Sequence, residues 1–175
     1  MGKVVFITGS VRSGKSKLAV EFGEKSSKKI VFLASCAPLD EEMKKRVAKH
    51  KQSRPRDWKT IEEPIDAADV ITEAKADELV IFDCLTLWIS NIMLKFDKEK
   101  LINEKIQELF LILSKTKAEV IVVSNEVGWG IVPENKLARQ FRDIVGITHQ
   151  KLAGISDEVY LVTAGIAQKL KESHE

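Results

Sequence analysis

The chain has 175 residues, 44% of them hydrophobic, which suits one folded domain spanning residues 1–175 with a buried core. The formal net charge is +2, and no basic stripe is interleaved with aromatic residues, so we expect no nucleic-acid partner. No apolar run approaches the roughly 18 residues of a membrane span. No cleavable leader is apparent, and Cys36 and Cys84 lack the spacing of a zinc or disulfide site, so we expect a cytoplasmic protein.

A phosphate-binding pattern directly follows the first apolar run, residues 4–7. Residues 9–16 fit G-x-x-x-x-G-K-[ST], in the order Gly9, Ser10, Val11, Arg12, Ser13, Gly14, Lys15, Ser16. The two glycines permit a tight backbone path with inward N–H groups, and a helix starting near Gly14 adds its positive end. Lys15 supplies a cation for the β- and γ-phosphates, and the Ser16 hydroxyl is a Mg²⁺ ligand. The sequence therefore predicts a P-loop that binds a nucleoside triphosphate.

Strand-like and helix-like segments alternate along the rest of the chain. The sequence predicts further strands at residues 30–34, 58–61, 79–82, 120–123, 159–162 and 166–170. It predicts helices at residues 14–25 and 39–51, one that residues 64–66 open and that ends near residue 74, then helices at residues 85–94 and 98–114 and one with Pro133 and Glu134 in its first turn. The core-facing residues expected in the last two helices are Ile102, Ile106, Leu109 and Leu113, then Leu137, Phe141, Ile144, Thr148 and Leu152. This alternation indicates an α/β fold, a single P-loop domain whose mostly parallel central sheet carries helices on both faces.

Asp83 ends the apolar run at residues 79–82, at the sheet edge that faces the ligand in nucleotide-binding α/β folds. One role for this carboxylate is to hold Mg²⁺ beside the Ser16 hydroxyl. The other is to cap the helix that follows. The P-loop upstream favours the metal role.

Two further sites, residues 124–126 and His50, each allow a functional and a structural interpretation. Ser124, Asn125 and Glu126 end another apolar strand, where they either orient a substrate hydroxyl or water or only mark the passage from strand to loop. His50 lies among Arg46, Lys49, Lys51 and Arg54 near the end of a predicted helix. It is either a surface residue or a neutral nucleophile, because cationic neighbours disfavour its charged form and attract phosphates.

A guanine-reading Asn-Lys-x-Asp motif is missing. Asn135 and Lys136 begin such a motif, but Ala138 stands where its aspartate is needed. This counts against a switch GTPase.

Several stretches together resemble one family, the bifunctional adenosylcobinamide kinase / adenosylcobinamide-phosphate guanylyltransferases. They are G-x-x-R-S-G-K-S at residues 9–16, D-E-E-M at 40–43, Arg46-x-x-x-His50, Arg54-Pro55-x-x-Trp58-x-Thr60-x-Glu62, D-C-L-T-L-W at 83–88, S-N-E-V-G at 124–128, G-I-V-P-E-N at 130–135, L-A-R at 137–139 and F-R-D at 141–143. The resemblance covers nearly the whole chain in collinear order, and the block from 125 to 143 is its most specific part.

The resemblance implies a RecA-like P-loop domain, a homotrimer and two activities. A kinase step, with ATP or GTP, phosphorylates the aminopropanol hydroxyl of adenosylcobinamide. A transferase step moves GMP from GTP onto adenosylcobinamide-phosphate through a guanylylated histidine, which aligns with His50. Besides the P-loop, the family's nucleotide contacts fall on Ala34, Ser35, Cys36, Lys51, Gln52, Ser53, Arg54, Glu62, Asp83 and Cys84.

Two other functions remain open at this point. A plain small-molecule kinase would use the same loop with His50 structural, and its protein would retain no α-phosphate label. A P-loop switch or assembly ATPase would hydrolyse slowly, with no dependence on a corrinoid.

Overall fold

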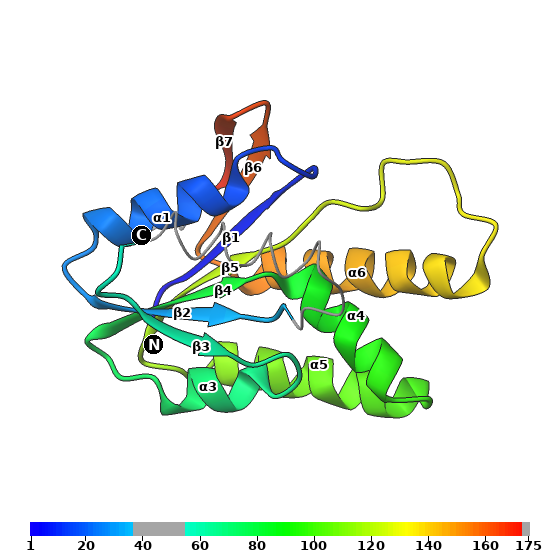
Figure 1. Ribbon diagram of the computed structural model, residues 1–175, viewed down its shortest axis with the longest axis horizontal. Coiled ribbons are helices and arrows are strands. Elements are labelled where there is room, and N and C mark those ends of the chain that lie inside the picture. Colours follow the sequence, from blue (N-terminus) through cyan, green and yellow to red (C-terminus); the bar gives the residue numbers. More distant parts are fainter. Residues whose placement is uncertain (37–54, 173–175) are drawn as a thin grey trace.

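The computed structural model describes residues 1–36 and 55–172, so the predicted helix at 39–51 lies outside the described residues. A seven-stranded sheet forms the centre, in the order β3-β2-β4-β5-β1-β6-β7 (Figure 1). The strands are β1 (Val4–Gly9), β2 (Lys29–Ala34), β3 (Lys59–Glu62), β4 (Glu78–Asp83), β5 (Glu119–Val123), β6 (Glu158–Thr163) and β7 (Ile166–Lys171). All neighbours run parallel except β6 and β7, which form an antiparallel hairpin. The predicted mostly parallel sheet is confirmed.

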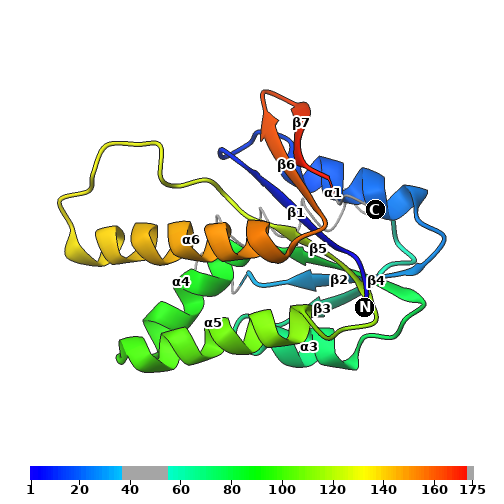
Figure 2. The ribbon, with the colours of Figure 1, turned by 180° about the vertical axis from the view of Figure 1, so that it is seen from behind.

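Helices cover both faces of the sheet. They are α1 (Lys15–Lys25), α3 (Ala67–Glu73), α4 (Leu85–Lys95), α5 (Glu99–Leu113) and α6 (Lys136–Ile155). Figures 1 and 2 show α1 on one side and the other four helices on the opposite side. Within β1, Val5 and Ile7 pack in the core beside α1, whereas Val4 and Phe6 pack in the core beside the other helices. Burial on both faces explains why the strands are continuous apolar runs.

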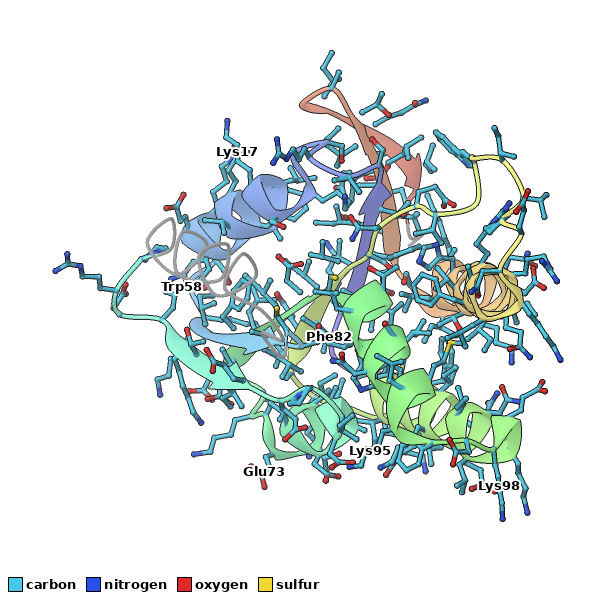
Figure 3. All side chains as sticks on the ribbon, turned by 45° about the vertical axis from the view of Figure 1, so that its right-hand side comes forward. Lys17, Trp58, Glu73, Phe82, Lys95 and Lys98 are labelled. Atoms are coloured by element: carbon cyan, nitrogen blue, oxygen red, sulfur yellow. The ribbon has the colours of Figure 1, made fainter. Side chains whose placement is uncertain are left out.

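Aromatic packing marks the centre of the larger core. Figure 3 shows Phe82 in the interior beside α4, whereas Lys17 and Glu73 project outward. The Phe82 ring meets Trp88 of α4 edge-on, with 6.3 Å between ring centroids. All four predicted core residues of α5 (Ile102, Ile106, Leu109 and Leu113) are buried.

One predicted helix start is wrong. The helix α6 begins at Lys136 and not at Pro133, because the Asn135 side chain caps it by accepting the Ala138 N–H. Leu137, predicted to face the core, is 49% exposed in the first turn of α6, whereas Thr148 and Leu152 are buried as predicted. The helix α3 begins at Ala67, directly after the residues predicted to open it, and Asp66 is its N-cap.

The sheet brings those predicted site residues that lie in the described part of the chain to one edge. Because β1 to β5 run parallel, their carboxyl ends meet there, followed by the P-loop after β1, Cys84 after β4 and Ser124 after β5. Within the parts of the chain that the structure describes, no helix is long and apolar enough to cross a membrane.

Candidate active site

The P-loop backbone requires glycine at its first position. Gly9 has φ +149°, and a Cβ there would lie 2.2 Å from the carbonyl oxygen of Val162 in β6. Gly14 also has a positive φ, +104°, although its surroundings leave room for a methyl group. Glycine is thus needed at position 9 because β6 leaves no room for a side chain, and it is favoured at position 14 because of the backbone conformation.

Hydrogen bonds from two distant segments hold the loop. The Gly165 N–H, in the turn between β6 and β7, donates to the Ser13 carbonyl at 2.8 Å. The Glu126 N–H, after β5, donates to the Gly9 carbonyl, also at 2.8 Å. These bonds attach both halves of the loop to the sheet, and local sequence gave no sign of them.

The start of α1 is suited to bind an anion. Gly14 is its N-cap in a left-handed conformation, and no side chain caps the first turn. The first turn also has no acidic residue. Its unpaired N–H groups and the positive end of the helix dipole are therefore available to phosphate oxygens.

Lys15 is held inside the loop. Its Nζ donates to the Ser10 carbonyl at 2.6 Å and lies 3.5 Å from Ser13 Oγ. Burial lowers the pKa of Lys15, and the nearby Asp83 carboxylate acts in the opposite direction. The ammonium group of Lys15 and the carboxylate of Asp83 therefore interact electrostatically.

Asp83 does not cap the following helix. The N-cap of α4 is Cys84, and among the described residues no side chain makes a capping hydrogen bond to its first turn, so the capping alternative is wrong. One strand, β5, separates β4 from β1, which places the end of β4 about 10 Å from the start of the P-loop. Within residues 1–36 and 55–172, neither Asp83 nor Ser16 has a side-chain hydrogen bond or ion pair.

This donor set fits Mg²⁺. The cation takes hard oxygen ligands and usually needs only one or two from the protein, with phosphate and water completing its octahedron. Among the described residues, no group of three or more His, Cys, Asp or Glu side chains could hold a metal by itself. The hydroxyl of Ser16 and the carboxylate of Asp83 therefore suit a metal that arrives with a nucleotide.

A buried clamp joins the ends of β2 and β4. Ser35 Oγ donates to the Cys84 carbonyl at 2.7 Å and accepts the Cys84 N–H at 3.0 Å. Burial raises the pKa of the Cys84 thiol to about 11, which keeps it protonated. The Ser35 hydroxyl thus fastens the sheet edge, and its contact with a nucleotide stays a prediction.

The register of the strands aligns three other predicted residues. Ala34 is paired with Glu62 on one side and with Asp83 on the other, so the three lie side by side across β3, β2 and β4. Cys36 follows in the same edge segment, and Cys36 and Cys84 form no disulfide. The predicted residues His50, Lys51, Gln52, Ser53 and Arg54 lie outside the described residues.

The polar group after β5 is built into two networks. The side chain of Asn125 donates to Thr86 Oγ1 in α4 at 3.2 Å. Ser124 Oγ lies 2.7 Å from His149 Nε2 in α6, and His149 Nδ1 lies 3.6 Å from Glu126 Oε2. Sequence reasoning did not single out His149, which is buried between these two polar groups. Its spacing of four after buried Val145 and three before buried Leu152 could have shown that it faces inward.

A long loop between β5 and α6 carries exposed apolar side chains. Figure 1 shows it in yellow, running out above α6 and returning to the start of that helix. Arg142 holds it by donating to the carbonyls of Ile131 at 3.0 Å and Gly128 at 3.1 Å. Trp129 is 74% exposed and Ile131 94% exposed.

Comparison with known proteins gives matches along nearly the whole chain. A family model described as "Cobinamide kinase / cobinamide phosphate guanyltransferase" matches residues 5–170. The bifunctional adenosylcobalamin biosynthesis protein CobU of Escherichia coli (strain K12) is 38% identical, over 96% of this chain and 99% of that protein. CobP of Pseudomonas aeruginosa, with the same description, is also 38% identical, over 94% of this chain and 95% of its own length.

Solved structures share the fold at low sequence identity. A type III secretion system ATPase has a TM-score of 0.57 at 14% identity, over 93% of this chain and 51% of that one. The RadB recombinase has a TM-score of 0.52 at 16% identity, over 91% of this chain and 74% of its own. These similarities support the RecA-like P-loop fold.

Proposed function

This chain belongs to the family of cobinamide kinases / cobinamide phosphate guanyltransferases, and on that premise we propose that it carries out both reactions. It phosphorylates adenosylcobinamide with ATP or GTP, then transfers GMP from GTP to adenosylcobinamide-phosphate, giving adenosylcobinamide-GDP for adenosylcobalamin synthesis. The observation that carries this proposal is the family match over residues 5–170, on a chain whose P-loop and Asp83 share one sheet edge.

The P-loop binds the triphosphate in both steps. The uncapped first turn of α1 offers its N–H groups to phosphate oxygens, and Lys15 exchanges its bond to the Ser10 carbonyl for the β- and γ-phosphates. Ser16 and Asp83 would hold Mg²⁺, which when bound would offset the negative charge of the phosphates.

Guanylyl transfer uses His50 as the nucleophile. A neutral imidazole nitrogen attacks the α-phosphorus of GTP, a P–N bond forms, and pyrophosphate leaves as the α–β P–O bond breaks. A phosphate oxygen of adenosylcobinamide-phosphate then attacks the same phosphorus and breaks the P–N bond. The resemblance supports this role for His50, and it also supports contacts from Lys51, Gln52, Ser53 and Arg54.

The nucleotide lies along the carboxyl edge of the sheet. Its triphosphate sits at the P-loop after β1, and the contacts assigned to Asp83, Cys84, Ala34, Ser35, Cys36 and Glu62 continue toward β3. Four strand spacings separate β1 from β3, a span of about 19 Å. This length suits a nucleotide whose base lies far from its γ-phosphate.

We also propose that the protein is a homotrimer and that both steps take place in the cytoplasm, where nucleoside triphosphates are available. The exposed apolar residues Trp129, Ile131 and Val132 support an interface at the loop before α6. Equilibrium sedimentation tests the trimer, and a monomer across the concentration range would exclude it.

The decisive experiment follows the two labels of GTP. Protein is incubated with Mg²⁺ and GTP labelled at the α- or the γ-phosphate, then denatured and assayed for retained label. Label from the α-position alone, stable to base, labile to acid and absent from His50→Asn, is expected. His174→Asn is the matched control and should retain the label.

Two outcomes support the alternatives. Protein that binds GTP and phosphorylates adenosylcobinamide but retains no α-label is a plain kinase. Slow hydrolysis of GTP or ATP, without label and without a response to adenosylcobinamide, identifies a switch or assembly ATPase.

A further inference from the structure

Glu126 lies directly beside the phosphate-binding loop. It follows β5, the strand between β1, which leads into the P-loop, and β4, which ends in Asp83. Its own N–H bonds to the carbonyl of Gly9, the first P-loop residue, at 2.8 Å. The main chain of Glu126 is thus fixed directly to the phosphate-binding loop.

Two contacts orient the Glu126 carboxylate. Oε1 accepts the Gly128 N–H at 2.8 Å, and Oε2 faces His149 Nδ1 at 3.6 Å. No lysine or arginine within residues 1–36 and 55–172 forms an ion pair with it. Its side chain is 20% exposed, so a substrate hydroxyl can reach it.

Buried residues contact the His149 ring and fix its position. Its ring packs on Phe6 with 5.2 Å between centroids, and Nε2 lies 2.7 Å from the Oγ of fully buried Ser124. Burial lowers the pKa of His149, while the Glu126 charge opposes that shift, so the ring is neutral near pH 7. We assign the proton to Nδ1, because a carboxylate only accepts and an Nδ1 lone pair would repel it. Nε2 then accepts the Ser124 O–H.

We propose that Glu126 is the general base of the kinase step and that His149, anchored by Ser124, positions its carboxylate. The inference rests on the proposed function, since it concerns the hydroxyl phosphorylated there. As the hydroxyl oxygen bonds to the γ-phosphorus, its proton passes to Glu126. The bond from the γ-phosphorus to the β–γ bridging oxygen breaks, and the nucleoside diphosphate leaves. The carboxylic acid then releases its proton to water.

The other half-reaction needs no base at this position. Guanylyl transfer starts from a neutral imidazole and ends on a phosphate oxygen, and neither nucleophile has to lose a proton. The two activities should therefore separate when the carboxylate is removed.

Glu126→Gln tests the base. The amide oxygen can still accept the Gly128 N–H, which preserves the local fold. The kinase kcat should fall by about 10²- to 10⁴-fold, the usual contribution of a general base, with KM changed less than about threefold. Protein labelled from α-labelled GTP to the wild-type level would show that the variant is folded and binds nucleotide.

A matched pair of substitutions at His149 tests whether this residue positions the Glu126 carboxylate. Asparagine can place an N–H near the position of Nδ1, facing Glu126, whereas glutamine reaches the position of Nε2, facing Ser124. His149→Asn should therefore keep kinase kcat within about fivefold of wild type, and His149→Gln should lower it by about 20-fold or more. A purely structural role predicts equal losses, or a larger loss for asparagine.

The failures of the two proposals are distinguishable. If wild-type protein neither phosphorylates adenosylcobinamide nor takes up α-label, the proposed function is wrong. If it does both, and Glu126→Gln retains kinase kcat within about threefold, Glu126 is not the base. Equal kcat for His149→Asn and His149→Gln would remove the positioning role.

Discussion

The Gly165 N–H donates to the Ser13 carbonyl at 2.8 Å, so the turn between β6 and β7 braces the P-loop. Gly165 has φ +83°, a conformation that β-branched residues strongly resist. Gly165→Val should move the turn, break this bond and weaken nucleotide binding about five- to tenfold. Calorimetric titration with GTP measures the change. Ala167→Val, in exposed β7 of the same hairpin, is the control and should bind normally.

Gly9→Ala should both destabilise the fold and prevent nucleotide binding. The added Cβ would overlap the Val162 carbonyl oxygen, and the backbone at φ +149° adds strain. We expect the free energy of unfolding in urea to fall by about 2–4 kcal/mol. Gly146→Ala, where nothing lies within 4 Å of the new methyl group, should instead raise it by up to about 1 kcal/mol. Equal effects at the two positions would contradict the steric account.

Asp83→Asn should weaken the response to Mg²⁺ while leaving the fold intact. Within the described parts of the chain, its side chain makes no hydrogen bond or ion pair, so the free energy of unfolding should change by less than about 0.5 kcal/mol. The Mg²⁺ concentration for half-maximal kinase activity should rise about tenfold or more, because a hard anionic ligand is lost. Asp97→Asn, on the exposed connection before α5, is the control. An unchanged Mg²⁺ response in Asp83→Asn would exclude the metal role.

Protonation of His149 should lower the free energy of unfolding in mild acid. Because burial lowers its pKa in the folded state, the unfolded chain binds this proton first as the pH falls below about 6.5. This contribution to stability is therefore present above that pH and lost below it, with a slope of at most about 1.4 kcal/mol per pH unit for one proton. Urea unfolding between pH 5 and 8 should show a smaller decline in His149→Asn than in wild type. Parallel curves would mean that His149 titrates alike in both states.

Local pattern predicted much of the fold and of the phosphate site. The P-loop motif, the apolar strands and the α5 stripe depend on neighbouring residues and on helix or strand periodicity, which any single chain displays. The start of α6 was predicted wrongly because a single side chain decides that boundary. Asn135 caps α6, so the helix starts after Pro133 and Glu134.

The sequence by itself thus determined the P-loop, the run of strands ending in Asp83 and in Ser124 to Glu126, and the family to which the chain belongs. Only the tertiary structure decided what surrounds them. The order of the sheet places β6 beside β1, which forces glycine at position 9 and brings Gly165 to Ser13. The packing of α6 against β1 brings His149 to Ser124, 25 positions away in the chain. Such contacts depend on which elements become neighbours in the sheet and its layers, and short-range periodicity carries no information about that choice.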